Sequence, residues 1–270
     1  MGGTLFAASR LYATSNHPEA QMARFTNTSI LITGGTSGIG LATAKRLSEE
    51  GARLLLTGGS PDHIEATKKA LPSATVIQND ASLVHTVEAL AQAVQDFAPD
   101  GLDGVFLNAG YGAFKTLEEI DAPDIDRHFD LNIRGPLLQA KALAKAIKDG
   151  GAIVLVGSGT VGGGRTDMLV YSASKAAVRQ AARSLATEFA PRGIRVNVVT
   201  PGATETHFHA RGGMNREDID AYREKVANAV PLGRLGKPED VAAVTSFLLS
   251  EDAAYVTGSE YRVDGGLTMA

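Results

Sequence analysis

Short, mainly apolar runs recur along the chain, and segments of helical character separate them. The apolar runs lie at 29–33, 53–57, 75–78, 104–107, 152–156 and 195–199. The helical segments lie at 41–50, 62–71, 83–97, about 125–147 and 171–189. Strands that are apolar throughout, rather than at every second residue, are typical of a parallel sheet covered on both faces. The alternation therefore predicts a doubly wound α/β fold, with helices on both faces of one parallel sheet.

Composition limits the remaining possibilities. The chain has 270 residues with no internal repeat and no linker, so we expect a single domain over residues 27–270. The net charge, 26 − 30 = −4, gives no reason to expect nucleic acid as a partner. The absence of cysteine excludes disulfides and is compatible with the cytoplasm, where we expect the protein. No apolar run approaches the roughly 18 residues of a membrane-spanning helix, so no membrane partner is expected.

The first 26 residues are expected to be an N-terminal extension outside the fold. Up to Gln21 they contain Arg10 as the only arginine or lysine and no acid before Glu19. This composition is compatible with a weak organelle-targeting segment. It is also compatible with a plain tail before a second start-like residue, Met22.

A glycine loop, TGGTSGIG, follows the first apolar run. Its glycines have the spacing G-x-x-x-G-x-G rather than the better-known G-x-G-x-x-G. Glycine permits positive φ and close approach of the backbone to a pyrophosphate. The following helix offers its free N–H groups and its positive end to the same anion. We therefore predict a Rossmann-like dinucleotide site, with contacts from Gly34, Thr36, Ser37, Gly38, Ile39 and Gly40.

The end of the second run bears on which dinucleotide is bound. An acid there would bind a ribose 2′-hydroxyl and repel a 2′-phosphate. The chain has Leu56-Thr57-Gly58-Gly59-Ser60 instead, with neither an acid nor an arginine to clamp a phosphate. Hydroxyl groups and backbone N–H groups around Gly59 and Ser60 can still hold a phosphate. We favour NADP(H) over NAD(H) as the cofactor.

Further cofactor contacts are expected where the third and fourth runs end. Asp80, followed by Ala81, can accept a hydrogen bond from an adenine amino group or cap the next helix. Asn108, Ala109 and Gly110 place small residues and one amide where a cofactor must pass.

The segment VYSASKAAV places Tyr171 and Lys175 four residues apart, on one face of a helix. A free tyrosine has a pKa of about 10, and a nearby ammonium favours the phenolate and lowers that pKa. Such a pair can transfer protons near neutral pH, although Tyr–Lys pairs also occur on surface helices. Ser158 ends the fifth run, 171 − 158 = 13 residues upstream, and its hydroxyl can bond a substrate carbonyl oxygen beside Tyr171.

Taken in order, these motifs resemble those of the short-chain dehydrogenase/reductase family, from about Ser29 to the C-terminus. They are TGGTSGIG, LNAG at 107–110, LNIRG around Asn132, Ser158, YSASK, PG at 201–202, PLGRLGKPEDVA at 231–242 and VTGSEYRVDGG at 256–266. Two positions depart from the family pattern, with Gly157 in place of a serine and Leu107 in place of an asparagine. Neither departure removes a catalytic group.

The resemblance implies a role for each motif. Tyr171 would be the general acid or base, Lys175 would lower its pKa and bind the nicotinamide ribose, and Ser158 would polarise the carbonyl. Asn132 would hold a water that links Lys175 to solvent. The nicotinamide and phosphate end of the cofactor would contact Pro201, Gly202, Thr204 and Thr206. The family also implies a homotetramer.

The segment Ala203 to Arg216 breaks the strand–helix alternation at the ligand end of the sheet. We expect it to be a mobile substrate lid, with an ordinary surface loop as the alternative. Substrate contacts are predicted at Ser158, Thr160, Tyr171, His207 and Phe208, with further lining from His209, Tyr111, Phe114, Gly159, Val161 and Met214. No metal site is predicted, because His207 and His209 lack a third ligand.

The resulting hypothesis is reversible hydride transfer between a nicotinamide cofactor and a small ketone or secondary alcohol. Three alternatives stay open: a 3-oxoacyl-carrier-protein reductase-like enzyme, a non-redox enzyme such as an epimerase or dehydratase, and a catalytically silent nucleotide-binding protein. The intact set of Asn132, Ser158, Tyr171 and Lys175 argues against the silent protein. The substrate and the direction of the reaction cannot be predicted from the sequence.

Overall fold

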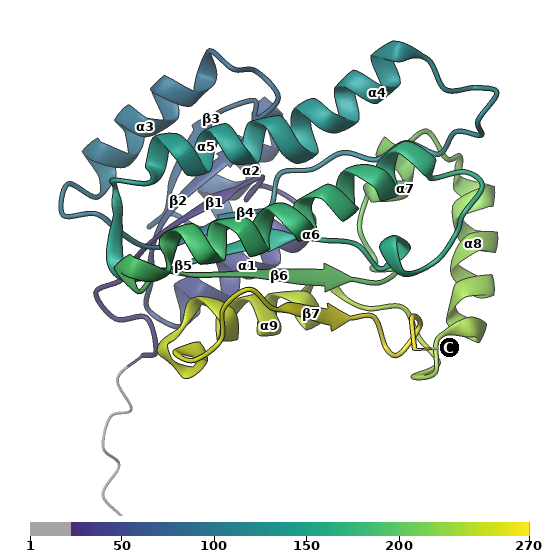
Figure 1. Cartoon of the computed structure of the whole chain (residues 1–270). Coiled ribbons are helices and arrows are strands. Elements are labelled where there is room, and N and C mark those ends of the chain that lie inside the picture. The colour runs from purple at the N-terminus through teal and green to yellow at the C-terminus, as the bar shows by residue number, and fades with distance from the viewer. Residues whose placement is uncertain (1–22, 270) are drawn as a thin grey trace, which may run out of the picture.

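A seven-stranded parallel sheet forms the centre of the computed structural model, which describes residues 23–269 (Figure 1). The strand order is β3-β2-β1-β4-β5-β6-β7, so the order reverses between β1 and β4. The strands are β1 (Ser29–Thr33), β2 (Arg53–Gly58), β3 (Thr75–Gln78), β4 (Leu102–Leu107), β5 (Ile147–Val156), β6 (Arg195–Pro201) and β7 (Glu260–Val263). The predicted α/β fold with a doubly wound parallel sheet is confirmed. The carboxyl ends of its strands lie along one edge of the sheet, where such sheets bind ligands.

Helices cover both faces of the sheet (Figure 1). Their bounds are α1 (Gly38–Glu49), α2 (Pro61–Ala70), α3 (Thr86–Phe97), α4 (Ala122–Phe129), α5 (Gly135–Leu143), α6 (Leu169–Phe189), α7 (Phe208–Arg211), α8 (Arg216–Ala229) and α9 (Pro238–Leu249). Buried side chains of α3, α5 and α6 share one core with the sheet. Those of α1, α2 and α9 share the other.

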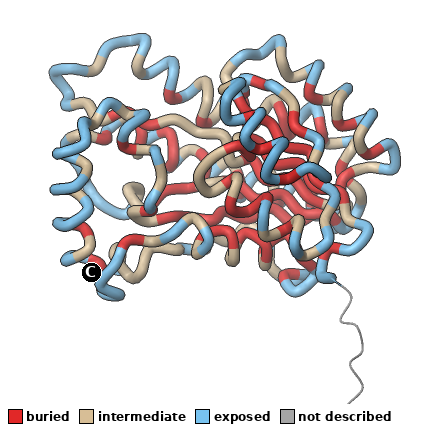
Figure 2. The backbone as a smooth tube through the Cα atoms, turned by 180° about the vertical axis from the view of Figure 1, so that it is seen from behind, coloured by how far each residue is buried: buried red, intermediate tan, exposed pale blue. Residues whose placement is uncertain are grey.

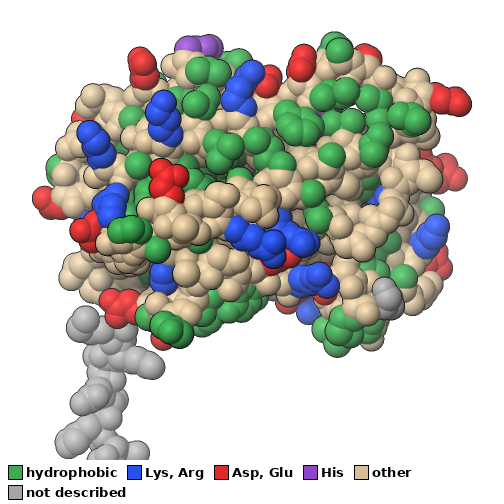
Figure 3. Space-filling model, in the orientation of Figure 1, with side chains coloured by type: hydrophobic (Ala, Val, Ile, Leu, Met, Phe, Trp, Pro, Cys, Tyr) green, Lys and Arg blue, Asp and Glu red, His purple; other side chains and the backbone are tan. Residues whose placement is uncertain are grey.

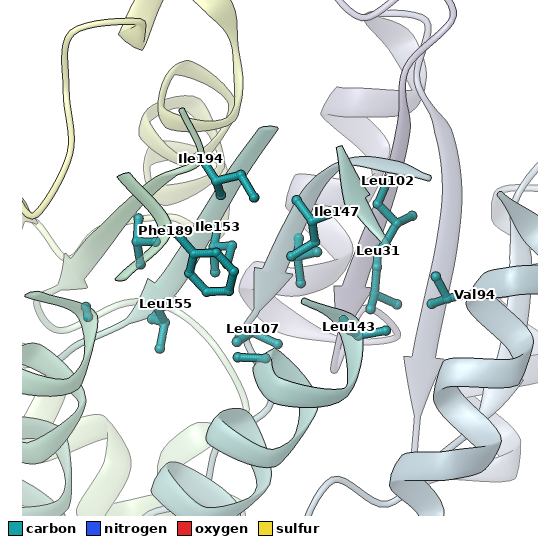
Figure 4. Close-up of a cluster of buried hydrophobic side chains, with 14 of the residues drawn as sticks. Leu31, Val94, Leu102, Leu107, Leu143, Ile147, Ile153, Leu155, Phe189 and Ile194 are labelled. Atoms are coloured by element: carbon teal, nitrogen blue, oxygen red, sulfur yellow. The ribbon is translucent and has the colours of Figure 1, made fainter. Parts of the chain in front are cut away.

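Successive strand residues belong to opposite cores, which explains the uninterrupted apolar runs. Leu31 on β1 packs on the side of α3, α5 and α6, whereas its neighbours Ile30 and Ile32 pack on the side of α1 and α9. Figure 2 shows the resulting band of buried backbone through the sheet, and Figure 4 shows the first core, with Leu31, Leu107 and Leu155 pointing toward α5 and α6. Both faces of each strand therefore require apolar side chains.

The predicted helix at about 125–147 is wrong at two points. A π-helical turn at Asp130–Arg134 separates α4 from α5, and β5 begins at Ile147 rather than at residue 152. Pro136 has no N–H to donate to the carbonyl of Asn132 four residues earlier, so a regular α-helix cannot continue through this point. Ile147 is buried and pairs with Leu102 of β4, so its packing places it in the sheet.

Most of the expected N-terminal extension, residues 1–22, lies outside the described residues. The described part begins with a turn in which Phe25 is 2% exposed and packs against the core that includes Ile30 and Leu47. The Phe25 N–H donates to the Glu50 carbonyl at 2.8 Å. The packed chain thus starts slightly before the boundary at residue 27 that we expected.

Candidate active site

A cavity of about 610 Å³ opens at the carboxyl ends of the strands, between the glycine loop and the segment 203–216. Most of the predicted site residues line it. From the cofactor set these are Gly34, Thr36, Ser37, Gly38, Ile39, Gly59, Ser60, Asp80, Ala81, Asn108, Ala109, Gly110, Pro201, Gly202, Thr204 and Thr206, and from the catalytic and substrate sets Ser158, Thr160, Tyr171, Lys175 and Phe208. From the same three sets, Gly40, Asn132 and His207 do not line it.

The glycine loop presents the start of α1 to this cavity. Gly34 and Gly38 have φ of 62° and 52°, values that side-chain-bearing residues rarely adopt. Ser37 precedes the helix, and its side chain makes no capping hydrogen bond to any described residue. The first turn of α1, which lies wholly within the described residues, also contains no acid. The free N–H groups and positive end of α1 therefore suit an anion such as the pyrophosphate of a dinucleotide.

Gly40 and Asn108 hold the glycine loop in this shape. A Cβ at Gly40 would lie 2.3 Å from the Gly34 carbonyl oxygen and 2.5 Å from Asn108 Nδ2. Asn108 Nδ2 donates to the carbonyls of Thr33 and Gly34, each at 3.0 Å. Gly40 thus permits close packing behind the loop, and Asn108 ties β4 to it. Both residues therefore shape the glycine-loop end of the cavity by contacts within the protein.

The end of β2 leaves room beside the cavity. A Cβ at Gly59 would meet no described atom within 4 Å, and the Ser60 hydroxyl accepts from the His63 N–H to cap α2. His63 lines the cavity here, a residue that the sequence analysis missed because no motif marks it. Asp80 does not cap α3, which begins at Thr86, and instead accepts from the N–H and hydroxyl of Ser82 at 3.0 and 2.7 Å.

Tyr171 and Lys175 lie in the first turns of α6, both buried, beside the end of β5. Lys175 Nζ donates to the Val156 carbonyl at 3.0 Å and lies 5.9 Å from the centroid of the Tyr171 ring. Ser158, two residues after Val156, has its Oγ 3.0 Å from Thr160 Oγ1. The predicted phenol, ammonium and serine hydroxyl therefore meet in one wall of the cavity.

Burial dominates the ionisation of the pair. It raises the pKa of Tyr171 to about 12, although the neighbouring Ser158 hydroxyl acts in the opposite direction. It also lowers the pKa of Lys175 to about 8. The expectation that Lys175 lowers the tyrosine pKa does not hold for the protein by itself, because both groups lose solvation and the ammonium is directed at a backbone carbonyl.

Replacing Lys175 by methionine is expected to raise the free energy of unfolding at pH 7 by up to about 3 kcal/mol. The pKa of this lysine falls from 10.5 to about 8 on folding, and a difference of about 2.5 corresponds to about 3 kcal/mol. The unfolded chain holds the proton more tightly than the folded chain. The free energy of unfolding of wild type therefore rises relative to that of the variant as pH increases from about 8 to 10.5. Urea unfolding at several values between pH 7 and 10 measures the difference, with exposed Lys141→Met as the control. A constant difference across that range would contradict the assigned burial cost.

Asn132 lies in the π-helical turn, behind the cavity wall. Its Oδ1 accepts from the Tyr111 N–H at 2.9 Å, and its Nδ2 donates to the Tyr111 carbonyl and to Ser174 Oγ, each at 2.9 Å. Both side-chain donors are thus used within the protein, so the side chain joins the 109–115 loop to α6. The backbone carbonyl of Asn132 has no α-helical hydrogen-bond donor, because the residue four positions later, Pro136, has no N–H.

Aromatic side chains of α7 and α8 close the substrate end. The Phe208 ring lies 5.3 Å from that of Tyr171, and the His209 ring lies 5.3 Å from that of Phe114 and 4.5 Å from that of Tyr222. Of the two predicted histidines, His209 lines the cavity and His207, which precedes the short helix α7, does not. Of the other further lining predictions, Tyr111 and Gly159 reach the cavity, whereas Phe114, Val161 and Met214 do not.

Other lining residues carried no recognisable signal in the sequence. They come mainly from the loop before α6 and from the segment after β6, and they include Arg165, Met168, Arg211 and Tyr222. Within residues 23–269, no three His, Cys, Asp or Glu side chains are grouped so that they could hold a metal ion. In the same part of the chain, no helix has the length and apolar character needed to cross a membrane.

Comparison with known proteins gives one consistent result over nearly the whole chain. A family model described as enoyl-(acyl carrier protein) reductase matches residues 34–268. The oxidoreductase asL5 of Sarocladium schorii is 37% identical over 248 residues, which cover 90% of this chain and 97% of the relative. The crystal structure of levodione reductase matches with a TM-score of 0.85 at 34% identity, covering 92% of this chain and 100% of that chain.

Two further structures contain nicotinamide cofactors. A 3-ketoacyl-(acyl-carrier-protein) reductase from Brucella melitensis, complexed with NADH, matches with a TM-score of 0.81 at 30% identity. A blue fluorescent protein from a metagenomic library, in complex with NADPH, matches with a TM-score of 0.80 at 30% identity. Each match covers 90% of this chain and 99% of the other.

Proposed function

Because the chain belongs to the short-chain dehydrogenase/reductase family, we propose that Tyr171 is its acid–base group, assisted by Ser158 and Lys175. The family makes the protein an NAD(P)-dependent oxidoreductase that interconverts a ketone and a secondary alcohol. The observation that carries the residue assignment is the buried position of all three side chains in one wall of the cavity, beside the glycine loop. A bound nicotinamide dinucleotide supplies or accepts the hydride.

In ketone reduction, Tyr171 Oη donates a proton to the carbonyl oxygen while the Ser158 hydroxyl donates a hydrogen bond to the same oxygen. A pKa of about 12 keeps Tyr171 protonated at neutral pH, so the phenol is ready to act as the acid. In alcohol oxidation, Tyr171 must first lose its proton, and the positive charge of an oxidised nicotinamide would add to that of Lys175 and favour the phenolate.

Protons must also reach the buried Lys175 from solvent. We propose that the backbone carbonyl of Asn132 holds a water next to Lys175 Nζ. The side chains of Asn132 and Lys175 both approach Gly110: a Cβ there would be 3.2 Å from Asn132 Oδ1 and 3.3 Å from Lys175 Nζ. The supporting observations are this proximity and the carbonyl that Pro136 leaves without its helical donor.

NADP(H) is the proposed cofactor in preference to NAD(H). Of the described residues that line the cavity, Asp80 is the only carboxylate, and it bonds to Ser82 rather than standing at the end of β2. The open space beside Gly59 and the Ser60 hydroxyl suit a 2′-phosphate. We expect reduced-nicotinamide absorbance assays with a panel of ketones to give kcat/KM roughly tenfold or more higher with NADPH than with NADH.

Gly59→Asp is expected to reverse this preference. The side chain fits the open space, where its carboxylate repels a 2′-phosphate and accepts a hydrogen bond from a 2′-hydroxyl. Gly59→Asn has the same shape without the charge and is the matched control. Equal use of both cofactors by wild type and Gly59→Asp would contradict the NADP(H) assignment. If no ketone consumed either reduced cofactor, the proposed function itself would fail.

We extend the proposal to a homotetramer in the cytoplasm, with one catalytic domain over residues 27–270. Support for self-association comes from apolar side chains left exposed on α4 and on α6: Ile125 is 44% exposed, Phe129 37% and Leu169 52%. Hydrophobic side chains gather on the face that carries these helices (Figure 3). Burying such surface against further copies of the chain is favourable.

A further inference from the structure

The substrate half of the cavity is lined by positive charge. Arg165, Lys175 and Arg211 all line it, and Asp80, the one carboxylate among the described lining residues, follows β3 at the far end, next to His63 and Ser60. The cavity therefore has opposite electrostatic character at its two ends. A cleft with low-dielectric walls and one sign of charge attracts ligands of the opposite sign.

Two of these three cations are already engaged within the protein. Arg165 donates from Nε and Nη2 to the Asp167 carboxylate at 3.2 and 3.0 Å, and its guanidinium lies 5.6 Å from the centroid of the Tyr222 ring. Lys175 Nζ donates to the Val156 carbonyl. Both are thus fixed in place by neighbours, and Arg165 is neutralised by its acid.

Arg211 is different. Its side chain makes no hydrogen bond or ion pair with any residue in the described part of the chain. Desolvation lowers the pKa of its guanidinium, and no carboxylate acts in the opposite direction. The residue as a whole stays exposed while it borders the cavity, as expected for a group at the mouth of a ligand site. Its full set of donors is available to a ligand.

The fold brings Arg211 close to the reacting groups. It follows Phe208 by three residues on α7, so the two side chains share a helix face. The Phe208 ring covers Tyr171 at 5.3 Å, and a Cβ at the next residue, Gly212, would lie 2.8 Å from the Gly112 carbonyl oxygen. The segment that carries Arg211 thus packs directly on the 109–115 loop, about one helical turn from the ring over Tyr171.

We propose that the substrate is a ketone or alcohol that also carries an oxyanion, a carboxylate or a phosphate, and that Arg211 binds this group. The guanidinium is planar and forms paired hydrogen bonds with oxyanions, which an apolar lid cannot replace. Arg165 and Lys175 add to the positive field but keep their own partners. The proposal rests on the proposed function, because it concerns the substrate of that same site.

The test compares matched compounds that differ in charge. Keto acids with one to four methylenes between the ketone and the carboxylate are assayed beside their methyl esters, and dihydroxyacetone phosphate beside dihydroxyacetone. We expect wild type to favour at least one charged member over its neutral partner by roughly 10- to 100-fold in kcat/KM. The pair that shows this preference tells a carboxylate substrate from a phosphate substrate.

Arg211→Gln should lower kcat/KM for the charged member much more than for its neutral partner and so remove most of that preference, and Arg211→Lys should retain part of it. Arg216→Gln is the matched control, because its side chain is 97% exposed and does not line the cavity. Equal use of charged and neutral compounds by wild type would overturn the proposal while leaving the proposed function intact. Weaker NADPH binding by Arg211→Gln, with the substrate preference unchanged, would also overturn it, since Arg211 would then serve the cofactor. If no compound in either series consumed reduced cofactor, the proposed function would fail and this inference with it.

Discussion

Replacing Tyr171 by phenylalanine is expected to lower kcat for ketone reduction by about 10²- to 10⁴-fold, the usual contribution of a positioned acid or base. The change removes only the hydroxyl, so the ring keeps its contact with Phe208, whose centroid lies 5.3 Å away. Lys175 keeps its hydrogen bond to Val156, and the glycine loop is not touched. Binding of NADPH, measured by fluorescence titration, should therefore stay close to that of wild type.

The expected loss of kcat comes only from the missing hydroxyl proton. Tyr255→Phe makes the same chemical change on a fully exposed ring and is the control for handling and stability. The variant keeps the ring and its packing, so its stability should stay close to that of wild type. Unchanged turnover by Tyr171→Phe would remove this residue from the mechanism. A parallel loss of NADPH binding would mean that the hydroxyl serves the cofactor rather than the substrate.

The architecture could be predicted from the sequence because it depends on local patterns. Each strand that is buried on both faces needs apolar side chains at consecutive positions, and Ile30, Leu31 and Ile32 meet this need in two different cores. The meeting of several candidate site residues was also predictable, since parallel strands end at one edge and the residues that follow them must meet there. Ser158 after β5 and Asn108 after β4 are placed in this way.

Other features depend on contacts between distant segments, which leave no local pattern. The apolar segment up to Ile147 resembles a continuing helix, and only its pairing with Leu102 places that residue in the sheet. Both His207 and His209 were predicted to line the cavity, and the position of the four-residue helix α7 decides that only His209 does. The ionisation of Tyr171 is a third case, because the lysine at i+4 was visible in the sequence but the burial that outweighs its charge was not.

Gly40→Ala is expected to weaken NADPH binding by roughly 100-fold, about 3 kcal/mol, and to lower stability by about 1–3 kcal/mol. The added Cβ would lie 2.3 Å from the Gly34 carbonyl oxygen, which is backbone and cannot swing aside. It would also press on Asn108 Nδ2 at 2.5 Å, whose hydrogen bonds to Thr33 and Gly34 hold the loop against β4. The loop must shift, and with it the N–H groups that face the cofactor.

This effect should appear without contact between the new methyl group and the cofactor, because Gly40 does not line the cavity. Gly236→Ala is the matched control: its Cβ would come no closer than 3.5 Å to another atom, an ordinary contact, and the residue lies outside the cavity lining. Calorimetric titration with NADPH and thermal unfolding of both variants separate the two effects. If Gly40→Ala bound NADPH as wild type does, the close packing of Gly40 against Gly34 would not be what shapes the cofactor loop.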